Sequence, residues 1–301
     1  MRDSFVECLR QAAIKDPSIL LLTGDLGFGV LNRFIESIPQ QCINMGIAEQ
    51  NMTGVAAGLA LEGYRVFTYS IGNFSSLRCL EQIRNDVCYP KVNVHIISIG
   101  SGLGYGSLGM SHHATEDVSI LRSLPNLAVY SPSDYAEVIA VAQACLTESG
   151  PSYIRLPRIK ADTQALRSVK VDTCNGFGAD QQQPLVLLTH GSCLAQAQAI
   201  AEQIPCAIYT VPRIKPLPTN LEAILKGRTQ VITLEQHNLD GGFGSAIGEW
   251  LLDHRVALPL IRLGLPNIFL TQGGTDQELS QQAGLGVAQC VQTIQQRMTH
   301  A

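Results

Sequence analysis

The chain has 301 residues, of which 46% are hydrophobic and 15% charged, and its formal net charge is −4. This composition supports a large buried core and excludes a disordered tail. The small net charge and the lack of a basic run give no support for a nucleic-acid partner. At about 100–200 residues per domain, the length predicts two domains.

The N-terminal stretch, residues 1–16, is charged and amphipathic and lacks the apolar core and cleavage site of a signal peptide. Apolar runs are far shorter than the ~20 residues that a membrane span needs. Nine cysteines are scattered without a Cys-x-x-Cys pair, which indicates reduced thiols and no cysteine metal site. We therefore expect a cytoplasmic protein with no membrane partner and no metal ligands of its own.

The first half alternates between strand-like and helix-like segments. Short apolar runs bounded by Gly, Pro or Asp predict buried strands at residues 19–23, 65–70, 92–98, 127–131 and 152–156. Apolar residues at three- and four-residue spacing predict helices at 48–61, 75–86, 116–123 and 135–148. Such alternation is typical of a mainly parallel sheet covered by helices on both faces.

The pattern weakens between about residues 159 and 184 and then restarts. Strand-like runs follow at 185–189, 207–211, 230–234 and 258–263. The sequence therefore predicts an α/β fold of two domains, at residues 1–160 and 184–301. Residues 161–183 are predicted to be a linker with an irregular edge.

One strand-to-helix turn carries an acid. Glu49 falls in the first turn of a predicted helix, three residues after Gly46. It could cap the helix and interact with its dipole. Alternatively, it is a buried carboxyl at the end of a strand, where open parallel sheets place their ligand sites. Composition leaves both interpretations open.

Residues 43–67, INMGIAEQNMTGVAAGLALEGYRVF, resemble the pyrimidine-binding domain of the transketolase family. That family includes 1-deoxyxylulose-5-phosphate synthases and split transketolases. The resemblance covers most of the chain, because shorter matches follow in the family's order and spacing at residues 81–86, 111–117, 124–126, 131–134, 215–218, 235–244 and 262–266. It implies a pyrimidine-binding domain followed by the transketolase C-terminal domain.

The resemblance implies that the cofactor is thiamine diphosphate and that Glu49 is catalytic. In the family, the glutamate at the position of Glu49 binds a ring nitrogen of the aminopyrimidine. A proton shared there favours the imino form of the exocyclic amine, which removes the proton from the thiazolium carbon. Phe74 stands where the family stacks an aromatic ring on the aminopyrimidine, although a Phe more commonly just fills a core. Ile71 and Leu77 stand at two further aromatic positions, so the cofactor pocket keeps its apolar character there.

His112 and His113 follow a glycine-rich stretch, residues 100–106. The resemblance implies that His112 is catalytic and contacts substrate hydroxyls, and it gives His113 a weaker substrate-binding role. A metal role is not expected, because adjacent side chains in an extended segment point in opposite directions. Arg158 matches a family arginine that binds substrate phosphate, or it forms a surface ion pair. Asp25 matches an acid that positions cofactor or partner at a subunit interface, or it is an ordinary turn residue.

The sequence departs from transketolases at three points. Gly100 replaces a phosphate-binding His, and Leu108 replaces an Asp that contacts a substrate hydroxyl. We therefore expect an acceptor that differs from an ordinary pentose phosphate. The chain also has no Gly-Asp-Gly motif, with which the family binds diphosphate and Mg²⁺. A separate N-terminal diphosphate-binding subunit is therefore expected, in a heterotetramer of two plus two chains, with the second domain supporting self-dimerisation.

The resulting hypothesis is the C-terminal subunit of a thiamine-diphosphate-dependent transketolase-like enzyme. It would transfer a two-carbon ketol or acyl unit from a ketose or 2-oxo acid donor to an aldehyde or ketone acceptor, in specialised sugar or secondary metabolism. Two alternatives remain at this point. One is the beta subunit of a 2-oxo acid dehydrogenase complex, and the other is a non-catalytic scaffold subunit that has kept the fold.

Overall fold

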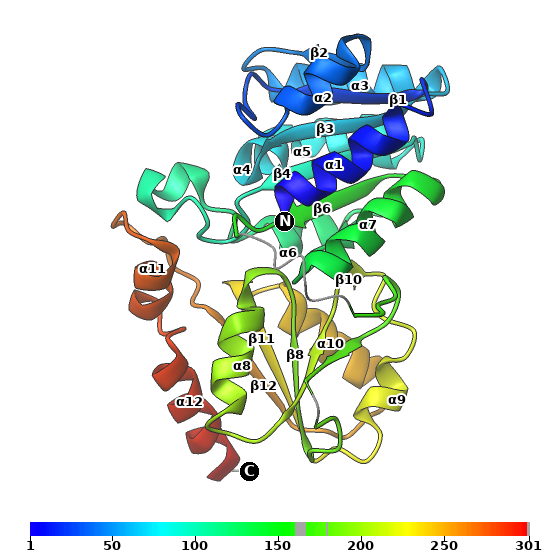
Figure 1. Cartoon of the computed structure of the whole chain (residues 1–301). Helices are drawn as coiled ribbons and strands as arrows, with labels where there is room; N and C mark the ends of the chain where they lie inside the picture. The colour runs from blue at the N-terminus through cyan, green and yellow to red at the C-terminus, as the bar shows by residue number, and fades with distance from the viewer. Residues whose placement is uncertain (160–166, 179, 300–301) are drawn as a thin grey trace.

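A computed structural model of the chain describes residues 1–159, 167–178 and 180–299. It contains two sheets, one above the other in Figure 1, each flanked by helices. The predicted α/β class with two mainly parallel sheets is confirmed. Of the predicted linker, residues 161–166 and 179 lie outside the described part of the chain. None of the described helices has the length and apolarity needed to cross a bilayer.

The first sheet has the strand order β10-β5-β6-β4-β3-β1-β2. All its pairings are parallel except that of β10, which comes from the second half of the chain and pairs antiparallel with β5. The inner strands at residues 19–23, 94–99 and 152–156 are fully buried, as expected when helices cover both faces, whereas the edge strand at residues 42–44 is partly exposed. The strands are β1 (Ile19–Thr23), β2 (Cys42–Asn44), β3 (Arg65–Ile71), β4 (Val94–Ile99), β5 (Ala128–Tyr130), β6 (Ser152–Leu156) and β10 (Arg213–Lys215).

The helices predicted at 48–61, 116–123 and 135–148 are confirmed, whereas the helices at residues 2–13 and 32–37 were not predicted. The helices around this sheet are α1 (Arg2–Ala13), α2 (Asn32–Ser37), α3 (Glu49–Leu61), α4 (Gly72–Ser75), α5 (Leu80–Gln82), α6 (Asp117–Arg122) and α7 (Tyr135–Thr147). The single helix predicted at 75–86 is wrong. The chain there forms α4, a 3₁₀ turn (Leu77–Cys79), α5 and a π-helical turn (Ile83–Cys88). The Ser76 hydroxyl donates to the Gly72 carbonyl, and such local bonds compete with the regular helical ladder.

The second sheet has the order β12-β11-β8-β9-β7, and only β7 is antiparallel. Its strands are β7 (Asn175–Phe177), β8 (Leu185–Thr189), β9 (Ala207–Thr210), β11 (Gln230–Asn238) and β12 (Leu260–Leu265). Its helices are α8 (Leu194–Ala201), α9 (Leu221–Leu225), α10 (Phe243–Asp253), α11 (Asp276–Gln282) and α12 (Val287–Thr299). The edge strand β7 lies within the range predicted as a linker.

A buried arginine joins the two halves. Arg155, on β6, is only 1% exposed. Its Nε donates to Asp117 Oδ2 at 2.8 Å, and its Nη2 donates to the carbonyls of Ala114 and Gln236, both at 2.9 Å. Gln236 lies on β11 of the second sheet, so one guanidinium bridges both sheets and the segment that leads into α6. The Tyr153 hydroxyl donates to the same Asp117 oxygen at 2.7 Å, which helps to stabilise the buried carboxylate.

Replacing Arg155 by Met should destabilise the chain by about 3–5 kcal/mol, because Asp117 would be left as a buried charge without a cation. The expected readout is a lower midpoint of urea unfolding. Arg33→Met is the matched control, since the Arg33 side chain is 76% exposed, and it should change stability by no more than about 0.5 kcal/mol. Equal midpoints for the two variants would contradict the bridging role of Arg155.

A second buried carboxyl holds α10 against β11. Glu235 accepts hydrogen bonds from the backbone N–H groups of Phe243 at 2.6 Å and Gly244 at 2.7 Å. Burial raises the pKa of Glu235 to about 7, although these two N–H groups oppose the shift. His237 Nδ1 lies 3.8 Å from Glu235 Oε2, and burial lowers the pKa of His237 to about 4.

These two shifts have opposite effects on stability. Between its ordinary pKa of 4.5 and the folded value of about 7, Glu235 binds more proton in the folded chain, so its contribution to stability is lost as the pH rises through that window. His237, with an ordinary pKa of 6.5, binds more proton in the unfolded chain, so its contribution increases as the pH rises from about 4 to 6.5. A substitution of Glu235 alone therefore separates its contribution to stability from that of His237.

Relative to Glu235→Gln, the unsubstituted chain should lose stability as the pH rises from about 4.5 to about 7, by up to about 3 kcal/mol. Both chains retain His237, whose pKa is set first by burial and then by Asp117 and Arg155, so most of its contribution cancels in the difference between them. The measurement is the free energy of urea unfolding at closely spaced pH values from 4.5 to 8. Curves that run parallel for the two chains would show that Glu235 keeps its ordinary pKa in the folded state.

Candidate active site

The predicted site residues lie at one edge of the first sheet, because the strands that lead to them are parallel. Asp25 follows β1, Glu49 follows β2, Ile71 ends β3, and Arg158 follows β6. The carboxyl ends of parallel strands meet at the same edge, where open α/β sheets bind their ligands. The glycine-rich stretch that leads to His112 follows β4 at this edge as well.

Glu49 is the first residue of α3 and is only 1% exposed. Its Oε1 accepts a hydrogen bond from the Ser70 hydroxyl at 3.1 Å, and its Oε2 lies 2.8 Å from Nη1 of Arg78. A Cβ at Gly24 would come within 3.3 Å of Oε1, so the glycine at the end of β1 leaves room for the carboxylate. Of the two interpretations of Glu49, the buried carboxyl at a strand end describes this geometry, since the residue makes no capping hydrogen bond.

Arg78 was not predicted as a site residue, yet it joins two residues that were. Its guanidinium pairs with Glu49 and also lies over the ring of half-buried Phe74, with Cζ 4.2 Å from the ring centroid. A planar cation therefore stacks on the aromatic ring while donating to the carboxylate. The four-residue spacing from Phe74 to Arg78 was the available signal, because residues at that spacing meet on a helical turn.

An aromatic row, which we define as Phe74, His112 and Tyr105, continues from this pair. The ring centroids of Phe74 and His112 are 5.0 Å apart with an edge-to-face orientation, and those of His112 and Tyr105 are 6.3 Å apart. Arg158 closes the far end, with Cζ 4.9 Å from the Tyr105 centroid. His112 thus stands between two guanidinium groups, and its Nδ1 lies 3.0 Å from the Ser111 hydroxyl.

Tyr105 explains one departure from the transketolase pattern. Gly100 has a φ of +81°, and a Cβ there would lie 2.1 Å from the Tyr105 ring. No residue with a side chain fits at position 100 while Tyr105 is in this place. The second departure, Leu108, has a 54% exposed side chain on the same glycine-rich segment.

Two predicted cofactor residues lie outside the aromatic row. Asp25 is exposed, has a φ of +58°, and accepts a hydrogen bond from the Asn44 side chain at 2.9 Å. It borders the site through Gly24, which packs on Glu49. Ile71 is half-buried at the end of β3, directly after Ser70.

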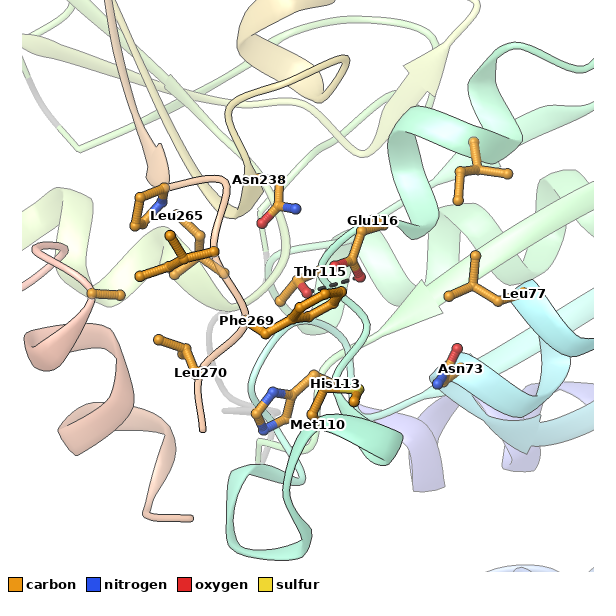
Figure 2. A pocket seen from close by; sticks show the side chains of 14 residues that line it. Asn73, Leu77, Met110, His113, Thr115, Glu116, Asn238, Leu265, Phe269 and Leu270 are labelled. Carbon is orange, nitrogen blue, oxygen red and sulfur yellow. Dashed lines mark hydrogen bonds between the residues drawn. The ribbon is translucent and has the colours of Figure 1, made fainter. Parts of the chain in front are cut away.

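The two adjacent histidines have different surroundings. His112 is half-buried in the aromatic row, whereas His113 is only 5% exposed and lines a cavity between the two halves of the chain (Figure 2). Burial lowers the pKa of His113 from its ordinary value. Among the residues that the structure describes, no group of three or more His, Cys, Asp or Glu side chains is arranged to hold a metal ion.

Two family models match the chain. The transketolase pyrimidine-binding domain matches residues 1–163, and the transketolase C-terminal domain matches residues 179–290. Among curated proteins, a putative transketolase C-terminal section from Methanocaldococcus jannaschii is 33% identical and covers 93% of this chain and 90% of its own length. A 6-deoxy-6-sulfo-D-fructose transketolase subunit from a Clostridium species is 34% identical, covering 97% and 92%.

Solved structures of similar fold belong to the same family as these relatives. A split-gene transketolase, described as an inactive β4 tetramer, superimposes with a TM-score of 0.84 at 29% identity and covers 99% of this chain and 97% of its own. The 1-deoxy-D-xylulose-5-phosphate synthase of Yersinia pestis is 31% identical over 94% of this chain, which spans only 46% of that enzyme. The match therefore corresponds to a whole subunit of split transketolases and to about half of a single-chain relative.

Fold, strand-end site and sequence similarity over nearly the full length therefore agree, and the chain belongs to the transketolase family of thiamine-diphosphate-dependent transferases, in which it corresponds to the C-terminal subunit of the split members.

Proposed function

We propose that this subunit binds the aminopyrimidine of thiamine diphosphate at Glu49 and Phe74 and that, with a partner subunit, it transfers a two-carbon ketol or acyl unit. The donor would be a ketose or a 2-oxo acid, and the acceptor an aldehyde or a ketone. The observation that carries the proposal is the convergence of a buried carboxylate, an aromatic ring and His112 at the carboxyl edge of the first sheet.

The residues present fit the cofactor's ring. An aminopyrimidine is planar and offers N–H groups, and the Arg78 guanidinium shares these two properties, although it lacks the acceptor nitrogens of the ring. Arg78 both stacks on Phe74 and donates to Glu49, so this place accepts a flat group that donates to a carboxylate. A bound aminopyrimidine would contact the same two residues, with Ile71 and Asp25 at its margin, and Arg78 would have to move aside.

When bound, thiamine diphosphate supplies a nucleophilic thiazolium carbon that carries the two-carbon unit. Glu49 holds a proton at the ring nitrogen, in a place that Ser70 helps to fix. His112 contacts the oxygen of the donor, and burial of Glu49 excludes water from the proton that it holds. Arg158, exposed beyond Tyr105, binds an anionic group of a substrate, and His113 contributes to substrate binding from the adjacent cavity.

A partner subunit completes this site in our proposal. Relatives covered over nearly their whole length are described as a transketolase subunit and as a C-terminal section, and the similar solved structure is a split-gene protein whose β4 tetramer is inactive. We propose a heterotetramer of two plus two chains, with the second domain supporting contact between two copies of this chain. The partner would supply the diphosphate site and the Mg²⁺ ligands, since no Gly-Asp-Gly motif occurs here.

The pathway is proposed at the level of substrate class. Relatives are described as acting on 6-deoxy-6-sulfo-D-fructose and apulose 4-phosphate, which supports a role in specialised sugar metabolism. Those descriptions favour a transketolase over the beta subunit of a 2-oxo acid dehydrogenase. The arrangement of Glu49, Phe74 and His112 favours a catalytic subunit over a scaffold. We place the protein in the cytoplasm, a proposal supported by its nine free cysteines.

Calorimetric titration of thiamine diphosphate with Mg²⁺ tests the split-enzyme proposal. The titration is made into this chain alone and into this chain copurified with a partner that carries the Gly-Asp-Gly motif. Binding with a dissociation constant on the order of micromolar is expected only for the mixture, because each chain holds one end of the cofactor. An absence of binding in the mixture would contradict the proposal and favour the scaffold.

A Glu49→Gln substitution tests cofactor activation without knowledge of the substrate. In the reconstituted mixture, exchange of the thiazolium C2 proton with deuterated solvent is followed by NMR. The exchange rate should fall by a factor of about 10²–10⁴, the usual contribution of a positioned proton-transfer group. Glu81→Gln is the matched control, since Glu81 is exposed. A Glu49→Gln protein that folds, binds the cofactor and exchanges at the unsubstituted rate would refute the assignment.

A further inference from the structure

A cavity of about 210 Å³ lies between the two halves of the chain, beside the residues assigned above. Most of its lining comes from three segments: the turn that holds Asn73 and Leu77, the segment from Met110 to Glu116, and residues 265–270 at and after the end of β12. Ile120, Asn238 and Ala283 complete the lining. Figure 2 shows His113 and Glu116 on the same cavity as Phe269 and Leu270. Of the residues assigned above, His113 lines it, whereas Glu49, Phe74, His112 and Arg158 do not.

The walls and mouth of the cavity are largely apolar. Leu77, Leu265 and Leu270 line it, while Met110, Ile268 and Phe269 are 53%, 60% and 69% exposed. An apolar cavity of about 150 Å³ is large enough to bind benzene. This cavity therefore has room for one six-membered ring with a short substituent, and its apolar lining would stabilise the ring by removing it from water.

The polar groups in the cavity mainly accept hydrogen bonds. His113 Nε2 is buried and has no hydrogen-bond partner within the described part of the chain. Burial lowers the pKa of His113, which favours the neutral ring, and one nitrogen of a neutral imidazole offers a lone pair. The Glu116 carboxylate also faces this space and accepts a hydrogen bond from Thr115 at 2.9 Å.

The side-chain amides of Asn73 and Asn238 are further polar groups in the lining of the cavity. The Asn73 side-chain nitrogen already donates to the Ser111 carbonyl at 3.0 Å, which leaves its oxygen as an acceptor. Asn238 can offer either end of its amide. None of the described residues that line the cavity is Lys or Arg, so they offer no cation to balance a phosphate or a carboxylate, and Glu116 would repel either. An orphaned buried acceptor is costly unless a ligand or water donates to it.

We propose that this cavity binds a small molecule with an apolar ring-sized body and a hydroxyl or ammonium group, and that it excludes phosphorylated molecules. The donor group of the ligand would satisfy His113 and Glu116, and its body would pack against Leu265 and Phe269. This site goes beyond the proposed cofactor chemistry. It nevertheless adjoins that site, because His113 follows His112 and Asn73 precedes Phe74, so a ligand here contacts the turns that carry both.

Three probes that share one ring test the binding chemistry: benzyl alcohol, benzylamine and phenyl phosphate. Saturation-transfer NMR and calorimetry on the full chain without cofactor should detect the alcohol and the amine, with dissociation constants on the order of 1 mM for ligands of this size. Phenyl phosphate should not bind. Equal binding of phenyl phosphate, or no binding of the other two, would overturn the proposal. A failure of thiamine diphosphate to bind would not affect this experiment.

Substitutions locate the binding. His113→Phe keeps a flat apolar ring and removes the acceptor, so the affinity for benzyl alcohol should fall about tenfold, the loss expected for one hydrogen bond. His254→Phe is the matched control, because His254 is exposed and directly follows α10. This variant should bind benzyl alcohol with the affinity of the unsubstituted chain. Glu116→Gln should weaken benzylamine more than benzyl alcohol, because only the amine is charged. Unchanged affinities in both cavity variants would place the probes elsewhere and overturn the assignment.

Ile268→Trp provides a check that does not depend on a buried substitution. Ile268 is 60% exposed at the mouth of the cavity, so a larger side chain there should leave folding intact while obstructing access. Benzyl alcohol and benzylamine should both bind more weakly to this variant. If both probes retain full affinity for Ile268→Trp and His113→Phe, the cavity is not their binding site.

Discussion

The buried guanidinium of Arg155 is the interaction on which the arrangement of this molecule depends. A charged group with no exposure is tolerated only when its hydrogen-bonding capacity is satisfied, and Arg155 satisfies it with Asp117, Ala114 and Gln236. Those partners belong to the first half, to the segment just after the two histidines, and to the second sheet. The same requirement therefore fixes the relative position of the halves and the path of the histidine-bearing segment.

A related constraint governs the candidate active site. Glu49 is buried where β2 leads into α3, and a buried carboxylate needs donors close to it. Ser70 and Arg78 meet that need in the chain as it stands, and the irregular helical turns after β3 place Arg78 over Phe74. Phe74 lies on α4 and Arg78 on the 3₁₀ turn that follows, so this irregular segment forms part of the site.

The glycine-rich segment after β4 separates two environments. On one side His112 lies between Phe74 and Tyr105, edge-to-face with the Phe74 ring and tilted against the Tyr105 ring, next to charged groups and solvent. On the other side His113 is buried against the second half of the chain, in an apolar cavity. Two identical side chains one residue apart therefore differ in burial and neighbours, and the proposed catalytic and ligand-binding roles follow from that difference.

The sequence by itself determined the class of the fold, since apolar runs bounded by turn residues and helical periodicity are local properties of the chain. Through the resemblance to the transketolase family it also predicted Glu49, Phe74 and His112 as site residues, and these lie at one edge of the first sheet. The tertiary structure decided what the pattern does not encode: the entry of β10 into the first sheet, the broken helix at 72–88, the pairing of Arg78 with Glu49, and the steric conflict between a side chain at Gly100 and Tyr105. Each of these features depends on which segments pack together. The free-energy cost of placing a polar side chain is set by its burial and its partners, and neither can be read from its position along the chain.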